Sequence, residues 1–506
     1  MDIAQNNTGE KVNTISTSLQ TNIDHLKQLF KDDDTIIFRD FENAENQKIK
    51  CFIVYLDAMV KTDSINEFII KPIVEGRIRA TASDLLNILI KRVLLNCDLE
   101  ILPDNVRLAE YLINGYTLLF IENITSAIAI NTKGWKVRGI EEPPSETIVR
   151  GPREGFTEAL NVNISLLRRR LKTPDLTFKF KELGSKTKTK ICISYINGIA
   201  QESIIAELEK RLNMINIDGV LDSGYIEELI KDAPHLPFRT IGTSERPDVI
   251  AGKLLEGRIA VLCDGSPVIL TLPYIFMEAF QSPEDYYNNY MFSSLNRLLR
   301  WFGYLLTTTT PSIYTALVTF HQELIPTQLL LSIAEARQGV PFPTIVEALG
   351  MLTVFEILRE AGLRMPKPIG QAVSIVGALV LGDAAVNARL VSAPMVIITA
   401  LTGISSFLIP QNISIIVVRL TLLLLSAFMG LYGYMYGIIG LTISLMTVRS
   451  FGIPYMLYVG TGTINFDSIK DTAIRAPLWF MTTRPKFIGK DSQRQSGELT
   501  KEKKVR

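Results

Sequence analysis

The sequence is poor in the residues from which metal sites, disulfides and catalytic centres are usually built. Its cysteines and histidines are few and scattered: Cys51, Cys97, Cys192, Cys263, His25, His235 and His321. The absence of a CxxC pair argues against a zinc site or a disulfide framework, so we expect each cysteine to be reduced and to lie in a core or strand. Isolated histidines argue against a His-based metal or catalytic cluster. We therefore predict no metal and no cofactor.

The chain also lacks a marked charge of one sign. Lysine and arginine residues number 53 and aspartate and glutamate residues number 52, which gives a net charge of +1. Because binding to phosphates needs a positive excess, the whole chain is not predicted to bind nucleic acid. Neither a GxxxxGK[ST] phosphate loop nor a nucleophile–base set is found, so we predict that the protein is not an enzyme.

No secretory signal is evident at the N-terminus. The opening residues, MDIAQNNTGEKVNTISTSLQ, lack the pattern of basic residues followed by an apolar run that such signals have. Residues 1–34 are therefore predicted to be a disordered cytoplasmic arm.

What the chain does have is an uneven distribution of apolar residues, which make up 47% of its 506 residues. Charges occur throughout the first part, apolar runs dominate from Trp301 to Met446, and a basic tail follows. The fold class predicted from this division is an α/β soluble region of two similar subdomains followed by an all-α polytopic membrane domain. The predicted segments after the arm are 35–150 (first α/β subdomain), 151–175 (connecting helix region), 176–296 (second α/β subdomain), 297–450 (membrane domain) and 451–506 (basic cytoplasmic tail).

Two passages of the soluble half resemble one another. Residues 48–71, KIKCFIVYLDAMVKTDSINEFIIK, and residues 189–211, TKICISYINGIAQESIIAELEKR, both run from an apolar strand into a helical pattern. Aligning Tyr55 with Tyr195 sets the offset at 195 − 55 = 140 residues. The strands are continuous apolar runs, which is typical of a sheet covered on both faces.

A second match lies downstream at nearly the same offset. Residues 106–123, VRLAEYLINGYTLLFIEN, resemble residues 248–265, DVIAGKLLEGRIAVLCDG, with Gly115 opposite Gly257 (257 − 115 = 142). Each copy thus reads strand, helix, intervening segment, helix, strand. Two α/β subdomains of similar build are predicted, and a chance likeness of generic strand–helix patterns is the alternative.

Between the copies lies a helix with three consecutive arginines. In GPREGFTEALNVNISLLRRRL (151–171), glycine and proline mark turns, and a helix then carries Arg168, Arg169 and Arg170. At about 100° per residue their side chains fan across roughly 200°, so they cannot form one narrow stripe. The segment is either a solvated hinge helix or a docking surface for a partner or for anionic lipid headgroups.

The second half contains four predicted membrane spans. They are 301–320, 391–409 and two within 413–448 that are separated by a break near Gly430–Gly433. The helix at 343–362 and the apolar piece at 369–382 are ambiguous, the latter because it is shorter than the roughly 20 residues of a usual span. The basic tail and the large N-terminal region are both expected in the cytoplasm, which fits an even number of spans.

One apolar helix, within 341–366, is unusual in carrying ionisable side chains. Four polar residues share one arc of its helical wheel, and Glu347 lies opposite them: Thr353, Glu356, Arg359 and Glu360. Glu356 and Arg359 are three residues apart and can pair locally. The helix either lies flat at the membrane surface with this arc in water, or several subunits set the carboxylates around a common axis as cation-selecting rings.

Further charges interrupt the apolar runs. Asp383 and Arg389 occur in LVLGDAAVNARLVSAP, and Arg419 lies within the next hydrophobic stretch. Asp383 and Arg389 either neutralise one another across a helix break or mark a short loop at the membrane face, and we favour the loop.

Four motifs in order, GPREGFTE (151–158), SERPD (244–248), PFPTIVEALGMLTVFEILREAGLRMP (341–366) and GQAVSIVGALVLGDAAV (370–386), resemble the A subunits of the GerA-family spore germinant receptors. The likeness runs from about residue 40 to about residue 485. The related SpoVAF branch shares these motifs. Where this chain has Asp383 and Arg389, the family pattern more often has glutamine and glycine, so an added charge pair is implied near the pore.

The resemblance implies a multi-pass protein of the spore inner membrane with both terminal regions in the cytoplasm. The family's A subunit would form a homo-oligomer, a pentamer, that acts as a nutrient-gated ion (cation) channel. Its partners would be membrane lipid, a permease-like B subunit that binds the nutrient, and a lipoprotein C subunit. A membrane transporter and a SpoVAF-like accessory channel remain the alternatives. Transporters usually have repeated membrane halves, whereas the repeat here lies in the soluble half.

The resemblance and the residue patterns together give two sets of candidate residues. Candidates for the channel or its gate are Glu347, Thr353, Glu356, Arg359, Glu360, Asp383 and Arg389. Candidates for organising the junctions around the two subdomains are Arg153, Glu154 and Arg246.

Overall fold

The structure is a computed structural model. It describes residues 14–47, 49–78, 82–94, 98–135, 146, 148–365, 382–409, 413–456, 471–472, 474–485 and 487–490. Some predictions fall outside these residues. They concern residues 1–13 of the arm, Cys97, the apolar piece 369–382 apart from its last residue, and the tail beyond residue 490.

The chain divides into two compact units, which are described separately. The first, here called the sheet unit, comprises Met1–Ile230, Ile241–Pro273 and Arg484–Gln493. The second, here called the helical unit, comprises Lys231–Thr240, Tyr274–Thr483 and Arg494–Arg506.

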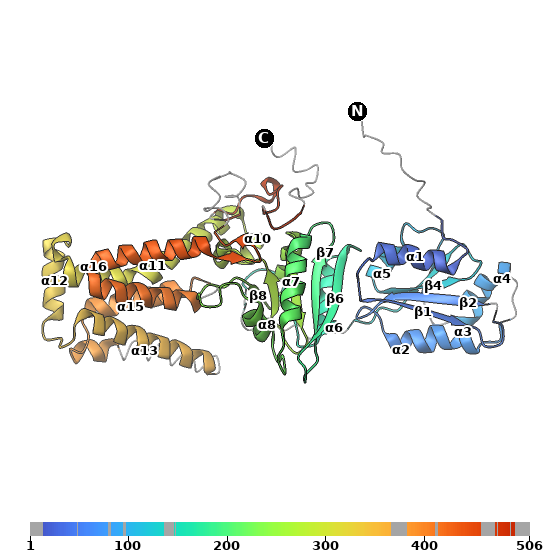
Figure 1. Ribbon diagram of the computed structural model, residues 1–506, viewed down its shortest axis with the longest axis horizontal. Coiled ribbons are helices and arrows are strands. Elements are labelled where there is room, and N and C mark those ends of the chain that lie inside the picture. Colours follow the sequence, from blue (N-terminus) through green and yellow to red (C-terminus); the bar gives the residue numbers. More distant parts are fainter. Residues whose placement is uncertain are drawn as a thin grey trace, which may run out of the picture. The chain divides into compact units, whose positions relative to one another are not determined.

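The sheet unit contains two antiparallel sheets of five strands each, shown in Figure 1. The first has the order β1-β2-β4-β5-β3, formed by β1 (Ile36–Glu42), β2 (Lys50–Leu56), β4 (Tyr116–Ile121), β5 (Ala127–Asn131) and β3 (Leu99–Leu102). The second has the equivalent order β6-β7-β9-β10-β8, formed by β6 (Leu176–Leu183), β7 (Thr189–Ile196), β9 (Ile259–Cys263), β10 (Ile269–Leu272) and β8 (Gly242–Ser244). The predicted α/β character of this region is confirmed, and the equal strand orders agree with the predicted repeat, whose subdomain bounds stay a prediction.

The first sheet is covered on both faces, as its continuous apolar strands predict. Because successive side chains of a strand point to opposite faces, Ile53 and Tyr55 of β2 join one buried cluster, and Phe52 and Val54 join another. The first cluster is completed by α2 (Thr62–Ile65), α3 (Lys71–Glu75) and α4 (Ala82–Ile88) with the π-helical turns Asn66–Ile70 and Leu89–Val93. The second is completed by α1 (Leu19–Leu29) and α5 (Leu108–Ile113), on the other side of the sheet in Figure 1.

Helix α1 corrects one prediction. Residues 1–34 were expected to be a disordered arm, but Leu19–Leu29 form a helix that buries Leu26 in the core of the first sheet. Phe30, directly after the helix, is buried in the same cluster. The stretch is mostly polar, so its composition gives little sign of the few apolar side chains that anchor the helix in the core.

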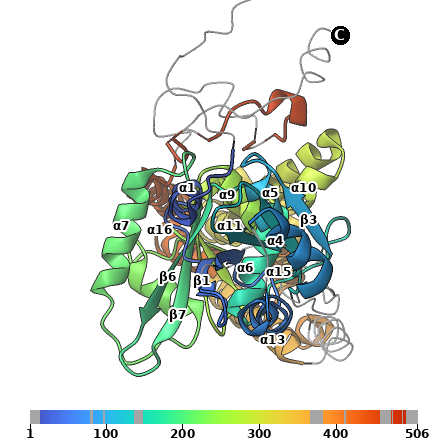
Figure 2. The same ribbon diagram turned by 90° about the vertical axis from the view of Figure 1, so that its right-hand side faces the viewer.

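The second sheet repeats the arrangement of the first. Helices α6 (Leu160–Arg170) and α9 (Pro247–Leu255) pack with Cys192 and Leu262 of the strands in one buried cluster. Helix α7 (Glu202–Met214) lies beside β6 and β7 in Figures 1 and 2. Helix α8 (Ser223–Ile230) follows it along the chain.

The two matched glycines occupy equivalent turns. Gly115 and Gly257 each join a helix to the next strand with a left-handed backbone, at φ values of 80° and 96°. A Cβ atom at Gly115 would lie 3.0 Å from the carbonyl oxygen of Met59, and one at Gly257 would lie 3.0 Å from that of Ile199. Since 199 − 59 = 140, these two carbonyls are also related by the offset of the repeat. The likeness between the copies therefore extends to their backbone geometry.

Three of the four cysteines are free and buried within the sheets: Cys51, Cys192 and Cys263. Burial raises the pKa of the Cys51 and Cys263 thiols to about 12. A thiol that stays protonated is a poor nucleophile and metal ligand. These three residues are core residues, as predicted.

The helical unit is built from long helices that lie side by side (Figure 1). They are α11 (Tyr290–Phe320), α13 (Thr344–Arg364), α15 (Ala393–Ser406) and α16 (Ile413–Thr447), with the shorter α10 (Glu284–Tyr287) and α12 (Thr327–Arg337). Within the described residues, one helix, Ser414–Thr447, is long and apolar enough to cross a membrane, and Ala393–Ser406 is a shorter apolar helix. The number of spans stays a prediction.

Helix α16 is interrupted where the sequence predicts a break. Gly430 has a non-helical backbone, with φ 60° and ψ −143°. A Cβ atom at Gly437 would touch the Leu422 and Leu425 side chains of the preceding arm, so the chain turns back on itself. Each arm has about 17 residues and measures about 25 Å. Such an arm is at the lower end of the length that crosses a bilayer.

Small polar residues fill the contacts between these helices. Buried examples come from α11 and α15: Thr307, Thr308, Ser312, Thr315, Thr399, Thr402, Ser405 and Ser406. Several hydroxyls donate to carbonyl oxygens one turn earlier, among them Thr308 to Tyr304 at 2.8 Å. This back-bonding allows hydroxyls to be buried without water.

Candidate functional site

The charged helix predicted from the sequence is α13. It begins at Thr344 after Pro343 and ends at Arg364, close to the predicted 343–362. Proline before the first turn and glutamate within it are typical of a helix start. The ionisable side chains of α13 have three different environments.

Glu347 is buried and bound within its own protomer. Its carboxylate accepts hydrogen bonds from the backbone N–H and the hydroxyl of Ser392, at 2.9 and 2.7 Å. Arg337 donates to its other oxygen at 3.4 Å. Ser392 is the N-cap of α15, where a carboxylate also interacts favourably with the helix dipole. Glu347 thus joins α12, α13 and α15.

Glu356 forms a cluster with two arginines. Nη2 of Arg359 lies 2.6 Å from one carboxylate oxygen of Glu356, which confirms the predicted local pair. Nη2 of Arg419, on α16, lies 2.6 Å from the other oxygen. The two arginines give this cluster a net charge of +1. Arg419 is almost fully buried, whereas Glu356 and Arg359 are partly exposed.

Thr353 and Glu360 lie on the exposed part of α13. The Thr353 hydroxyl donates to the carbonyl oxygen of Leu349 at 2.7 Å. The Glu360 carboxylate pairs with Arg364, one turn along, at 2.6 Å, and these side chains are 56% and 80% exposed. This end of α13 therefore exposes a charged pair, Glu360 and Arg364, beside the apolar Ile357, which is 62% exposed.

Asp383 and Arg389 are both exposed and lie at the ends of a helical segment, residues 382–387, and the turn after it. Across the described residues no ion pair joins them. Arg389 has a left-handed backbone, with φ 55°, and its guanidinium lies next to Gly339. This geometry does not agree with mutual neutralisation, and the interpretation as a short loop at the membrane face stays a prediction.

In the sheet unit, Arg246 joins the connecting segment to the second sheet. It is fully buried, and its guanidinium donates to the carbonyl oxygens of Pro152 and Glu146 at 2.6 and 3.4 Å. It also pairs with Asp248, in the first turn of α9, at 3.0 Å. Burial raises the pKa of the neighbouring Glu146 carboxyl, which accepts a hydrogen bond from the Ser244 hydroxyl.

The three consecutive arginines of α6 have two different environments, and the docking surface for a partner or for lipid headgroups stays a prediction. Arg169 and Arg170 pair with Glu154, a predicted junction residue, at 3.4 and 2.8 Å. Arg153, the third junction candidate, is exposed. Arg168 is fully buried against Asp33, so the interpretation of a solvated hinge helix is wrong for this residue.

Arg168 links the two sheets. Besides Asp33, it donates to the carbonyl oxygen of Leu176 at 2.9 Å and to the Thr35 hydroxyl at 3.2 Å. Next to it, the backbone N–H of Asp34 donates to the carbonyl oxygen of Phe178 on the edge strand β6 at 2.9 Å. The sequence gives no signal for this junction, since Asp33 lies 135 residues from Arg168.

A second buried network, also missed from the sequence, lies at the start of α11. Asp285 of α10 pairs with Arg297 at 2.7 Å and with Arg300 at 2.6 Å. Arg297 also pairs with Asp471 at 2.9 Å. Burial opposes ionisation of Asp285, but the hydrogen bonds and charges of Arg300 and Arg297 hold its pKa below the ordinary value. Arg300 directly precedes the predicted span 301–320, but its partner Asp285 could not be found from the sequence.

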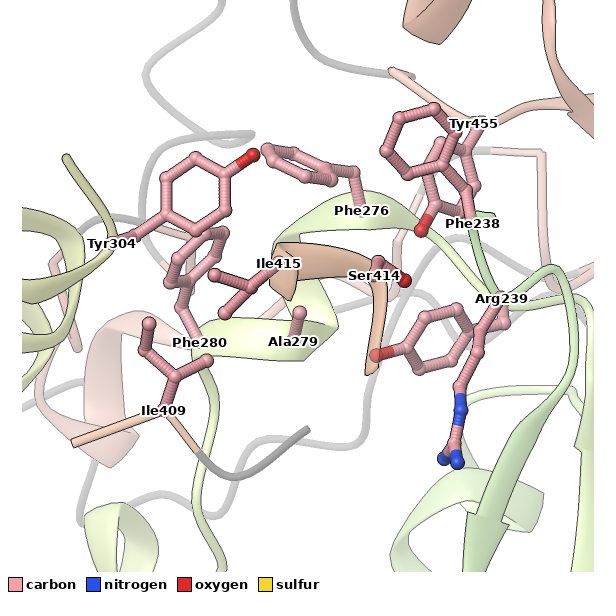
Figure 3. A pocket seen from close by; sticks show the side chains of 11 residues that line it. Phe238, Arg239, Phe276, Ala279, Phe280, Tyr304, Ile409, Ser414, Ile415 and Tyr455 are labelled. Carbon is pink, nitrogen blue, oxygen red and sulfur yellow. The ribbon is translucent and has the colours of Figure 1, made fainter. Parts of the chain in front are cut away.

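The helical unit has a small cavity lined by aromatic and aliphatic side chains, among them Phe276, Phe280 and Tyr304 (Figure 3). Its volume is about 30 Å³. That space suits one or two water molecules and is far smaller than the roughly 300 Å³ of an ordinary ligand pocket. Among the described residues no group of His, Cys, Asp and Glu side chains could hold a metal ion.

The architecture so far defines a protein with a paired α/β sheet unit and a helical unit that contains an apolar hairpin. Comparison with known families assigns the class. The profile described as "Bacillus/Clostridium GerA spore germination protein" matches residues 24–487, so the chain belongs to this family. The resemblance noted on the four motifs is therefore confirmed.

Several characterised and uncharacterised proteins are similar to the chain over most of their length. The chain is 41% identical to spore germination protein KA of Bacillus subtilis (strain 168) over 487 residues. This alignment covers 96% of the chain and 89% of that protein. The chain is 43% identical over 478 residues to the uncharacterized membrane protein YfkQ of the same strain, covering 93% and 91%. With spore germination protein GerLA of Bacillus cereus it shares 37% identity over 442 residues, covering 87% and 89%.

Among solved structures, the chain is similar to the crystal structure of the N-terminal domain of the A subunit of the Bacillus megaterium spore germinant receptor GerK3. The sequence identity is 30% and the TM-score is 0.42. The match covers 53% of this chain and 99% of that one.

Proposed function

We propose that this protein is the A subunit of a spore germinant receptor and that several copies form a gated cation channel in the spore inner membrane. Membership of the GerA family and the similarity to germination proteins support the germination role. The apolar hairpin of α16 supports a membrane location. The channel itself is supported by the charge distribution on α13.

The observation on which the channel proposal depends is the exposed charged end of α13. Glu360 and Arg364 project from a helix that packs against the apolar α15. Ionisable groups at bilayer depth are costly unless they face water or a protein interior. Copies of the chain arranged around a common axis would give this face an aqueous path, in which rings of carboxylates favour cations.

The Glu356 cluster supports a gate. In the present conformation Arg359 and Arg419 neutralise Glu356, so its carboxylate is unavailable to a permeating cation. The packing of α13 into the buried core of the unit, through Ala348 and Leu352, lies before this point in the helix. Beyond Leu352, α13 is held by the Phe355 ring, which packs against Gly403 and Phe407, and by the contact between Glu356 and Arg419. Release of this ion pair would open the path.

The remaining parts of the proposal concern partners. A permease-like B subunit that binds the nutrient and a lipoprotein C subunit would complete the receptor, and the chain would assemble as a homo-oligomer, a pentamer. The sheet unit would relay the signal. Arg246 and Glu154 would stiffen its connecting segment, and Arg153, which is exposed, would be available to a partner.

The experiment is a flux measurement on the full-length protein in liposomes. Glu356→Gln should lower the preference for cations over chloride, and Arg419→Gln should raise basal cation flux several-fold by freeing the Glu356 carboxylate. Glu335→Gln, which changes an exposed carboxylate of α12, is the matched control and should leave flux unchanged. If all three variants assemble and conduct like the parent protein, Glu356 is not part of the permeation path or its gate.

A further inference from the structure

The first half of α11 has its polar and apolar faces reversed with respect to a helix in water. Large apolar side chains on one side are 50–66% exposed: Met291, Phe292, Leu295, Leu298, Phe302 and Leu305. At about 100° per residue they occupy an arc of about 140°. Among the described residues of the protomer, nothing covers this broad apolar stripe.

The opposite side of the same turns is polar and buried. Ser293 and Arg297 are almost inaccessible to solvent, and Arg300 is nearly so. The two arginines are bound by Asp285 and Asp471, as described above. A helix in water would bury its apolar side and expose its arginines, so this helix is adapted to apolar surroundings.

A second segment extends the apolar stripe. Leu478 and Phe480 are 60% and 43% exposed, and the Trp479 ring meets the Tyr290 ring edge-on with centroids 6.0 Å apart. The segment is held firmly to α11, because the Ser294 hydroxyl accepts from the backbone N–H of Arg475 at 3.2 Å. It is thus a fixed part of the unit.

We propose that this surface, here called the aromatic foot and formed by residues 291–299 of α11 and 474–480, rests in the interfacial layer of a phospholipid bilayer with its apolar side chains among the acyl chains. This inference goes beyond the channel proposal and does not depend on it. It concerns where α11 enters the membrane rather than what the helices conduct.

Three observations favour lipid over a protein partner. The stripe runs without interruption into Phe302 and Leu305, within the segment predicted to span the membrane. Trp479 and Tyr290 lie at its outer end, where such residues are enriched at membrane interfaces. The sequence from Arg484 to Arg506 carries eight basic residues against three acidic ones, which complements anionic headgroups.

The proposal changes the predicted boundary of the first span. Contact with lipid would begin at Met291, ten residues before Trp301, which corresponds to about 15 Å along the helix. The ion pairs of Asp285 with Arg297 and Arg300 would then lie at headgroup depth. The protein would shield them from both water and lipid.

The test uses the full-length protein in vesicles of phosphatidylcholine and phosphatidylglycerol whose acyl chains carry bromine near the headgroup end. Bromine quenches tryptophan emission on contact. The difference in emission between the parent protein and Trp479→Phe is the emission of Trp479. We expect the brominated lipid to quench this emission. Leu229→Asp, which changes an exposed apolar residue of α8 in the sheet unit, is the control and should leave this quenching unchanged.

A second measurement needs no tryptophan replacement. A photoactivatable carbene carried on a lipid chain should label residues 291–299 and 474–480 of the unmodified protein, as read by mass spectrometry. Labelling that starts only at Trp301, together with emission from Trp479 that brominated lipid does not quench, would overturn the proposal. If Leu478→Asp then also reduces the size of the assembled particle, the foot is an interface between copies of the chain.

Discussion

The sheet unit buries Phe52 and Phe120, stacked with ring centroids 4.5 Å apart, and exposes ion pairs such as that of Arg77 with Glu45. The helical unit buries Arg297 and exposes Phe302. One chain thus contains two opposite distributions of polarity. The difference is the one expected if the first unit is surrounded by water and the second by an apolar medium, as we propose.

The contrast also shows how each unit is stabilised. In the sheet unit, burial of a large apolar side chain stabilises the fold by roughly 1.5–3 kcal/mol. In the helical unit, surrounding lipid would remove much of that driving force, and close packing of small residues with internal hydrogen bonds would take its place. Both units also bury charges, and the fully buried Arg168, Arg246 and Arg297 are each paired with an aspartate.

The largest effect is expected from breaking one of these buried pairs. Arg168→Ala removes the partner of the buried Asp33 and should lower the free energy of unfolding of the sheet unit by about 3–5 kcal/mol. This change in the free energy of unfolding can be measured by urea unfolding of the full-length protein, with hydrogen exchange of the strands as the readout. The matched control is Arg77→Ala at an exposed pair, which should cost less than about 1 kcal/mol. Equal losses would mean that burial of the pair is immaterial.

The strands, the break at Gly430 and the helix 344–364 could all be predicted because their signals are local. Apolar runs bounded by turns predict strands, and an ionisable pair three residues apart predicts the contact between Glu356 and Arg359. These features depend on neighbours within a turn or two of chain.

The partners across the fold could not be predicted. Arg419 lies 63 residues from Glu356, and the two meet only because α13 and α16 pack together. A helical wheel gives the face on which a charge lies but not the helix that covers that face. For the same reason, Asp285 and Asp471 could not be predicted as partners of the arginines of α11, although Arg300 directly precedes a predicted span.

A smaller effect is expected from alanine substitutions at two glycines of the helical unit, one tightly packed and one not. A Cβ atom at Gly403 of α15 would overlap the ring of Phe355 on α13, so Gly403→Ala should lower stability by about 1–3 kcal/mol. Gly350, within α13, has no atom close enough to meet a Cβ, and Gly350→Ala should stabilise the helix by up to about 1 kcal/mol. Thermal unfolding in detergent compares the two variants. Equal shifts of Tm would contradict the close-packing account.

The smallest effects concern two carboxyl groups that should respond to pH in opposite ways. Burial raises the folded-state pKa of Glu146, so its contribution to stability is complete below about pH 4 and is lost as pH rises through the folded value. Despite burial, Arg300 and Arg297 lower the pKa of Asp285, so its contribution is complete above about pH 4 and is lost as pH falls through the folded value.

Tm measured against pH separates these groups. Glu146→Gln should raise Tm at neutral pH, with a difference that shrinks toward about pH 4. Asp285→Asn should lower Tm at neutral pH, with a difference that shrinks only below about pH 4. Parallel pH profiles for both variants and the parent protein would contradict the opposite shifts.

The central claim is that the exposed charged end of α13 faces water enclosed by several copies of the chain. Electron microscopy of the detergent-purified full-length protein tests it most directly. We predict a closed ring of protomers in which Thr353, Glu360 and Arg364 point toward the axis. A particle of one protomer, with α13 lying flat at the edge of the detergent micelle, would contradict the claim.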